Sequence, residues 1–347
     1  MKAAVVILNW NGKRLLQEYL PSVVAHTLTN PSSEVELVVA DNGSSDGSLE
    51  FLRSNYPNIR LLDLGSNYGF AKGYNLALEQ VDSTYTVLLN SDVEVEAGWL
   101  STLVEYMDAH PNVAACQPKI RSARRKSYFE HAGACGGYLD ALGYPFCRGR
   151  ILESVEEDKG QYDAPINVFW ASGACLCIRT SIYKEAGGLD EHFFAHMEEI
   201  DLCWRLRSRD MRIVCVPSSV VYHLGGATLS KENPHKTFLN YRNNLLMIYK
   251  NARSSALFPV LFARFFLDYG SALVFLLSGK KGDAAAVFKA RCAFWSMRKS
   301  YTAVRKANLS KQKLPLIPEV LKGSMVLGYY FNGKKTFSAL SAFQGRF

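Results

Sequence analysis

Apolar runs and segments of helical periodicity alternate through the first 90 residues. The runs lack the polar alternation of a half-buried strand, so they predict strands covered on both faces. These predicted strands are 3–8, 35–40, 59–64 and 85–89. The segments between them with helical spacing are 13–26, 49–55 and 69–80. This repeat predicts an α/β fold with a mostly parallel, doubly wound sheet and flanking helices.

The pattern is less regular after residue 90. Residues 111–165 give no clear assignment: they include a basic loop at 121–126 and a Gly- and Tyr-rich stretch at 133–149, and either a solvated insertion or part of an acceptor surface explains them. Further on, apolar runs again predict strands, the last two on either side of Pro217. The predicted strands are 168–178, 213–216 and 220–223, and the predicted helices are 181–186, 198–209 and 236–251.

Each of the first four predicted strands is followed by a polar cluster. In parallel sheets, ligands bind at the carboxyl ends of the strands, so the four clusters are expected to form one composite site. Polar loops are common at such positions, which is enough to explain any single cluster but less so all four together. The clusters are Asn9–Asn11, Asp41–Asp46, Asn67–Gly73 and Asn90–Asp92.

Two of these positions suggest metal chemistry. Asp92 directly follows a buried strand, where a carboxylate can hold Mg²⁺ or Mn²⁺ against a diphosphate, or can simply cap the next segment. His223 ends a predicted strand before Gly225 and Gly226, where a neutral imidazole nitrogen can bind a metal. A lone His is more often structural, so both interpretations stand.

Three carboxylates, Glu198, Glu199 and Asp201, open the helix predicted at 198–209. The helix dipole favours acidic residues there, so an ordinary first turn is one interpretation. Asp201 and Arg205 are four residues apart and can pair on one face. Glu198 and Asp201 share a face of this helix, and Glu199 points about a third of a turn away, which predicts that it projects into a cleft.

The amino-acid composition limits the classes of protein to which this chain can belong. With 48% hydrophobic residues the chain can bury a substantial core, which excludes a disordered or low-complexity protein. The 8 Cys lack paired metal-binding spacing and are too dilute for a disulfide scaffold, so we expect reduced thiols in the cytoplasm. The apolar run at the N-terminus is too short for a signal peptide.

Charge divides the chain near residue 250. From residue 251 on there are 16 Lys and Arg against 3 Asp and Glu, whereas the preceding residues hold 24 and 29. Segment 256–277 is apolar but contains Arg264 and Asp268, so it can be a membrane span, an in-plane helix or a hairpin packed with 284–301. Basic amphipathic helices favour an anionic membrane surface, although helices packed on the protein body explain them too. No nucleic-acid-binding motif accompanies the charge.

Seven segments, taken in order, resemble the inverting glycosyltransferases of family 2, and most of all the rhamnosyltransferase-like branch that builds bacterial surface polysaccharides. The resemblance runs from about residue 3 to 250. It implies a nucleotide-sugar-binding GT-A domain over residues 1–250, followed by a basic helical region over 251–347. The segments are VVILNWNG (5–12), VVADNGSSDGS (38–48), NYGFAKGYN (67–75), LLNSD (88–92), 172–174, GGLDEHFFAHMEEIDLCWR (187–205) and 241–243.

The resemblance also implies roles for single residues. Asn90-Ser91-Asp92 matches the family's DxD-type motif, and the acidic pair 198–199 matches the pair whose second member is the general base. Asn90 replaces the first Asp, and Glu199 stands where Asp is usual, so Glu198 or Asp201 remains possible as base. The implied metal ligands are Asp92 and His223. The implied substrate-binding residues are Asn9, Asp41, Asn67, Gly69, Phe70, Lys72, Asn75, Asn90 and Arg242.

The expected activity is therefore metal-dependent, inverting sugar transfer with Mn²⁺ or Mg²⁺. The donor would be a dTDP- or UDP-sugar, rhamnose being one option, and the acceptor a hydroxyl of a lipid-linked or polysaccharide molecule. We expect a cytoplasmic protein peripheral to the inner face of the plasma membrane. A sugar-nucleotide nucleotidyltransferase is one alternative, although segment 9–14 is poor in Gly. A non-catalytic, membrane-bound scaffold with the same fold is the other.

Overall fold

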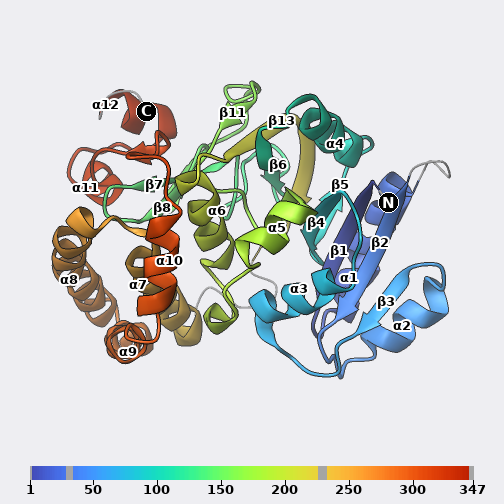
Figure 1. Cartoon of the computed structure of the whole chain (residues 1–347), viewed down its shortest axis with the longest axis horizontal. Coiled ribbons are helices and arrows are strands. Elements are labelled where there is room, and N and C mark those ends of the chain that lie inside the picture. Colours follow the sequence, from blue (N-terminus) through green and yellow to red (C-terminus); the bar gives the residue numbers. More distant parts are fainter. Residues whose placement is uncertain (1, 29–33, 226–232, 344–347) are drawn as a thin grey trace.

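A computed structural model describes residues 2–28, 34–225 and 233–343. Its centre is a nine-stranded mixed sheet in the order β11-β13-β6-β12-β4-β1-β2-β3, with β5 paired to β13 (Figure 1). The strands are β1 (Ala3–Asn9), β2 (Val35–Asp41), β3 (Arg60–Asp63), β4 (Tyr85–Asn90), β5 (Val93–Val95), β6 (Val113–Ser122), β11 (Ile166–Asn167), β12 (Cys175–Arg179) and β13 (Arg212–His223).

The first four large strands are parallel, as the alternating pattern predicts. Their register aligns Asn9 with Asp41 across β1 and β2, and Leu8 with Asn90 across β1 and β4. The polar residues that end these strands therefore meet at one edge of the sheet. Strand β12 interrupts the parallel order because it runs antiparallel to both β4 and β6.

Helices cover both faces of the sheet. Successive residues of β1 point to opposite faces, so Val5 and Ile7 pack in one core layer and Ala4 and Val6 in the other. The first layer holds α1 (Lys13–Thr27), α2 (Ser48–Asn55) and α4 (Trp99–Ala109). The second holds α3 (Gly69–Glu79), α5 (Thr180–Ala186) and α6 (Glu198–Ser208), with the short 3₁₀ helix η1 (Glu191–Phe193) beside them.

Three assignments differ from the sequence prediction. The predicted strand 168–178 is a strand only from Cys175, because residues 168–174 form one isolated bridge, between Trp170 and Gly137, and no continuous ladder. The two short strands around Pro217 are one strand, β13, whose register shifts between Val216 and Val220. Within 111–165, the long strand β6 is followed by a second sheet of β7 (Gly137–Asp140), β8 (Pro145–Cys147), β9 (Arg150–Ile151) and β10 (Ser154–Val155).

The C-terminal third is helical and packs on the second sheet. Strand β14 (Val320–Leu321) adds to this sheet by pairing with β7. Helices α8 (Ser254–Leu277) and α9 (Lys281–Met297) form the hairpin that was one of the three options for segment 256–277 (Figure 1). The division of the chain at residue 250 stays a prediction. The helices are α7 (Pro234–Asn251), α8 (Ser254–Leu277), α9 (Lys281–Met297), α10 (Thr302–Ser310), α11 (Met325–Tyr330) and α12 (Phe337–Phe343).

Candidate active site

The ends of β1 and β2 form one hydrogen-bonded unit. The buried Asn9 amide donates to Asp41 Oδ2 at 2.9 Å and to Ser44 Oγ at 3.2 Å. Asp41 Oδ1 in turn accepts the Ser44 backbone N–H. Asn9 Oδ1 is buried and has no partner in the described part of the chain. This unpaired acceptor leaves capacity to bind a donor group of a ligand.

The loop before α3 continues the same edge. Asn42 donates to Asn67 Oδ1 at 3.2 Å and to the Gly69 carbonyl at 3.1 Å. Gly69 has φ +76°, and a Cβ added there would lie 2.4 Å from the Phe194 ring, so only glycine fits. The Phe194 carbonyl accepts the N–H groups of Phe70 and Ala71. Residues 191–197 therefore support the start of α3.

The next candidates along this edge, Asp92 and His223, are brought together by strand pairing. Asp92 precedes β5, and the β5–β13 register sets His223 opposite Val93. Asp92 Oδ1 lies 3.1 Å from His223 Nε2, and both side chains are buried. Asn90 Nδ2 lies 3.3 Å from the same ring nitrogen. The structure thus places three of the predicted residues in contact.

Glu130 is a member of this cluster that the sequence prediction missed. Its carboxylate is buried and lies 3.5 Å from His223 Nδ1, on the far side of the ring from Asp92. Burial lowers the pKa of His223, but the attraction of Asp92 and Glu130 more than offsets it and raises this pKa to about 10. Burial raises the pKa of Asp92, and its interaction with His223 brings it below the ordinary value.

The donor set fits a divalent cation. Asp92 and His223 Nε2 face each other, and a carboxylate and an imidazole nitrogen are both ligands that Mn²⁺ accepts, provided that the cation displaces the Nε2 proton that the raised pKa retains. Glu130 stands behind His223 as carboxylates do behind metal-binding His residues. Among the described residues, no group of three or more His, Cys, Asp and Glu side chains forms a complete metal site. Further ligands would therefore have to come from the substrate and water.

The acidic pair opens α6 in a buried setting. Glu198 Oε2 and Glu199 Oε2 are both buried and find no hydrogen-bond partner in the described residues. Burial raises the pKa of Glu198 well above its usual range, and the Glu199 charge adds to the rise. Burial also raises the pKa of Glu199, but the backbone N–H groups of Ile200 and Gly173 oppose it. Burial therefore disfavours the charged form of both carboxyls, and the charge of one opposes ionisation of the other, so Glu198 and Glu199 titrate as a pair.

Asp201 differs from Glu198 and Glu199 because both of its carboxylate oxygens have hydrogen-bond partners. It is fully buried and accepts from Arg205 Nε at 3.0 Å, Lys250 Nζ at 2.8 Å and Asn251 Nδ2 at 2.7 Å. The pairing with Arg205 confirms the expectation from their spacing. Burial raises the pKa of Asp201, but Lys250 and Arg205 more than compensate and lower it. With both oxygens bonded, this carboxylate has little capacity to accept a substrate proton.

The loop that leads into the acidic pair is strained. Phe194, His196 and Met197 have φ values of +64°, +71° and +74°, a region that residues with a Cβ adopt at a cost of about 1–3 kcal/mol each. Asn243 of α7 offsets this cost by donating from Nδ2 to the carbonyls of Phe193, Ala195 and His196 at 2.8–2.9 Å. Sequence reasoning noted the Tyr241-Arg242-Asn243 motif but did not assign Asn243 this role.

A short crossing segment links the cation cluster to the acidic pair. Asn90 donates its backbone N–H to the Ala174 carbonyl at 3.0 Å. A Cβ added to the preceding residue, Gly173, would lie 3.3 Å from Phe70 and 3.8 Å from the Glu199 Cβ. The loop before β12 thus joins Asn90, Phe70 and Glu199. Residues from four separate chain segments come together at the predicted edge.

Three other predicted binding residues are engaged with protein groups. Asn75 accepts from the Tyr183 hydroxyl and donates to the Leu189 carbonyl, so it ties α3 to the segment before η1. Lys72 is partly exposed, 3.8 Å from Glu191. Arg242 donates to the carbonyls of His192 and Phe193 and so supports the same strained loop as Asn243.

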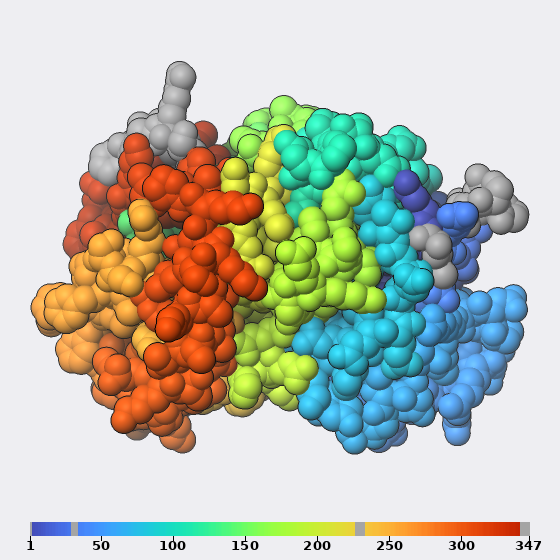
Figure 2. All heavy atoms as spheres, in the orientation of Figure 1, coloured from blue at the N-terminus to red at the C-terminus, as the bar shows by residue number. Residues whose placement is uncertain are grey.

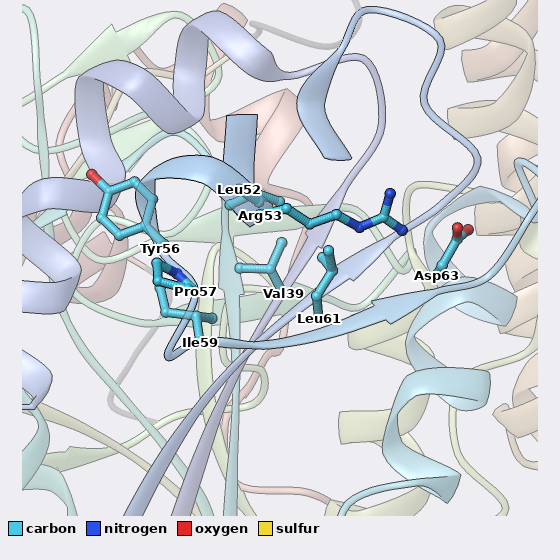
Figure 3. Close-up of a pocket in the computed structure, with 8 residues that line it drawn as sticks. All are labelled: Val39, Leu52, Arg53, Tyr56, Pro57, Ile59, Leu61 and Asp63. Carbon is cyan, nitrogen blue, oxygen red and sulfur yellow. The ribbon is translucent and has the colours of Figure 1, made fainter. Parts of the chain in front are cut away.

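A separate pocket of about 290 Å³ lies between α2 and β3 (Figure 3). Tyr56 and Pro57 stand at one end and Arg53 and Asp63 at the other, over an apolar floor. None of the predicted site residues lines this pocket. Asp63 lies opposite Asp41 in the β2–β3 register, so one end of this pocket reaches the edge of the sheet where the polar clusters meet.

Comparison with known proteins gives the class of protein. The model of the family "Glycosyl transferase family 2" matches residues 4–187, more than half of the chain. The chain therefore belongs to glycosyltransferase family 2, and it is an enzyme that transfers sugar in glycan biosynthesis.

Individual relatives narrow the comparison. An N-acetylglucosaminyl-diphospho-decaprenol L-rhamnosyltransferase of Mycobacterium tuberculosis is 28% identical over 63% of this chain and 75% of the relative. Rhamnosyltransferase WbbL of Escherichia coli is 22% identical over 60% of this chain and 79% of the relative. The rhamnosyltransferase-like resemblance is thereby confirmed.

Solved structures confirm the GT-A fold. Staphylococcus aureus TarS 1–349 has a TM-score of 0.53 at 16% identity and covers 90% of this chain and 89% of its own. A mannosyltransferase of Pyrobaculum calidifontis, solved with GDP-Man and Mn²⁺, has a TM-score of 0.51 at 15% identity, over 89% of this chain and 85% of its own.

Proposed function

We propose that this chain is a divalent-cation-dependent, inverting glycosyltransferase of bacterial surface glycan synthesis. It transfers a sugar, rhamnose being the first candidate, from a dTDP- or UDP-sugar to a hydroxyl of a lipid-linked or polysaccharide acceptor. The relatives that are rhamnosyltransferases support this choice of sugar. The observation that carries the chemistry is the junction of the Asn90 turn, Phe70 and Glu199 through the loop at Gly173.

The donor lies along the sheet edge in this proposal. Asn9 and Asp41 hold the nucleoside, since they form a fixed polar unit in which Asn9 Oδ1 is buried and has no partner within 2–28, 34–225 and 233–343. Asn67, Gly69 and Phe70 shape the adjoining pocket, and Asn90 closes it. Asp92 and His223 would hold Mn²⁺ or Mg²⁺, which supplies charge neutralisation for the diphosphate leaving group.

Glu199 takes the proton from the acceptor hydroxyl. An alcohol is a weak nucleophile, so a carboxylate must accept its proton as the new bond forms. Glu199 suits this role because the backbone N–H groups of Ile200 and Gly173 favour its charged form, and its Oε2 has no competing partner among the described residues. One displacement from the face opposite the leaving group inverts the anomeric carbon. We assign Asp201 to structure rather than to proton transfer, because its bonds to Lys250 and Arg205 occupy it.

The test combines a donor panel with two isosteric variants. Purified protein is incubated with dTDP- and UDP-sugars, Mn²⁺ or Mg²⁺ and a lipid-linked N-acetylglucosamine diphosphate, and both nucleotide release and sugar transfer are measured. Glu199→Gln should lower kcat about 10²–10⁴-fold, and the exposed Glu105→Gln on α4 should leave it unchanged. Pyrophosphate release from a nucleoside triphosphate would instead indicate a nucleotidyltransferase. Donor binding without any transfer would indicate the scaffold.

A further inference from the structure

Helix α8 has an unusual distribution of burial. In the described residues it is the one helix long and apolar enough to cross a membrane by length and composition. Only Arg264, Asp268 and Ala272 are buried, all on one stripe that faces the protein. The helix lies at the end of the molecule opposite α2 and β3 (Figure 2). Most of the large apolar side chains of α8 therefore face away from the protein and do not fill a core.

The two charges inside α8 are fixed in the protein. Asp268 accepts from Arg264 Nε at 3.0 Å, from Arg291 of α9 at 2.8 Å and from the Tyr144 hydroxyl at 3.1 Å. Arg264 also donates to the side-chain oxygen of Asn244 on α7. Spanning a bilayer would take this network apart and expose its charges to hydrocarbon, at considerable cost. These contacts therefore favour a helix that stays packed on the protein over a helix that spans a bilayer.

The outward side of α8 continues onto α9. Every exposed residue of α8 from Phe258 to Leu277 is apolar or glycine. Ring contacts connect Phe265 to Tyr269 and Tyr269 to Phe288 of α9, each with 4.9 Å between centroids. We call this surface the outer α8–α9 face, and its exposed large apolar members are Phe258, Phe262, Phe265, Phe266, Leu273, Val274, Leu276, Leu277, Phe288 and Trp295.

The surrounding charge has one sign. The region after residue 250 has three acidic residues, and all are buried: Asp268, Asp283 and Glu319. Asp283 is bonded to Thr237, and Glu319 to Arg207. By contrast, the Lys residues beside the outer α8–α9 face are exposed, namely Lys280, Lys281, Lys289 and Lys299. In the described residues after 250, the exposed charged side chains are therefore all positive.

We propose that the outer α8–α9 face lies in the plane of an anionic lipid bilayer, with its aromatic side chains among the acyl chains and the Lys residues at the headgroups. Apolar area beside a cationic rim is the pattern that binds such surfaces. A second copy of this chain would present the same positive rim and repel it. The proposal does not depend on the sugar-transfer chemistry, since none of the residues assigned to that chemistry lies on α8 or α9.

Vesicle sedimentation tests the proposal. The full chain should sediment with phosphatidylglycerol-containing vesicles and much less with pure phosphatidylcholine. Phe262→Glu/Phe266→Glu should reduce the partition coefficient at least about tenfold, given that charges are expelled from the acyl region. Lys280→Glu/Lys281→Glu should lower it by more than about fivefold per residue, since each change also adds a negative charge. The control Ile166→Glu, on strand β11, should bind like the parent.

Two further measurements distinguish a lipid-bound outer α8–α9 face from a face covered by a second copy of the chain. Brominated lipid should quench Trp fluorescence, and Trp295→Phe should remove much of the quenching; quenching that persists undiminished would overturn the proposed orientation.

Ultracentrifugation should show the parent and the Phe262→Glu/Phe266→Glu variant in the same oligomeric state. If that variant instead converts a dimer to a monomer, a second copy covers the face and the proposal is wrong. Circular dichroism establishes that each variant is folded, and failed sedimentation of the folded parent also overturns it.

Discussion

Replacing Asn243 by Ala should disable the enzyme without altering any residue that contacts substrate. Its Nδ2 donates to three carbonyls of the 193–196 segment, and its Oδ1 accepts from Arg242. Two N–H hydrogens are shared among three acceptors, so we count two net bonds at about 0.5–1.5 kcal/mol each. The buried carbonyls left behind add a desolvation cost, which brings the expected loss of unfolding free energy to about 2–4 kcal/mol.

The effect on catalysis follows from the strain in the segment. Without Asn243, Phe194, His196 and Met197 can relax from positive φ, and this moves Glu199 at the start of α6. A displacement of about 1 Å is enough for a loss of about 10²-fold in kcat. The acid limb of the kcat–pH profile should also shift, because the burial that raises the pKa of Glu199 changes.

The assay is steady-state sugar transfer from pH 5 to 9, with thermal unfolding of the same samples. Asn240→Ala is the matched control: it lies one turn earlier on α7, and its amide donates only to Lys236 within the helix among the bonds described. That variant should keep its kcat and its pH profile. A folded Asn243→Ala enzyme with kcat within twofold of the parent and an unmoved acid limb would refute the positioning role.

Further predictions concern stability and cation binding. The pKa of Glu198 is raised on folding, so its ionisation destabilises the folded state as pH rises above about 4.3. Glu198→Gln should therefore raise Tm at pH 8 and change it little at pH 4, and an equal change at both would contradict this. Asp268→Ala leaves two buried Arg side chains without their carboxylate and should cost about 3–5 kcal/mol in denaturant unfolding, against less than about 0.5 kcal/mol for exposed Asp82→Ala. Asp92→Ala should weaken Mn²⁺ binding in calorimetry about 10-fold or more, whereas unchanged affinity would exclude this carboxylate as a ligand.

The N-terminal half of the sheet was predictable because buried parallel strands have a simple signature. With helices on both faces, β1, β2 and β4 need apolar residues at nearly every position, and the strand ends then share an edge. The polar positions Asn9, Asp41 and Asn90 could thus be grouped from the sequence alone. Their hydrogen bonds could not, since these depend on side-chain rotamers.

The second sheet and Glu130 were not predictable in the same way. Strands of two to four residues, such as β7 and β9, are too short to show a period. Glu130 approaches His223 because β13 runs parallel beside β6, with His223 opposite Ser122, and the Glu130 N–H bonds back to Ile120. That proximity arises from pairing over about a hundred residues, which no local pattern contains.

Under the proposed function, the strained segment 191–197 supports both the donor pocket and the residue that accepts the proton. Its Phe194 carbonyl fixes the first N–H groups of α3, whose preceding loop shapes the proposed donor pocket. Its other end continues into the acidic pair, and Asn243 holds the middle. This one segment contacts the start of α3 and leads into the start of α6. A donor that packs against Phe70 would therefore contact the element that also positions Glu199. If two separate loops held these elements, Glu199 could be correctly positioned while the donor pocket was not. Because one segment holds both, the position of Glu199 and the shape of the donor pocket depend on each other.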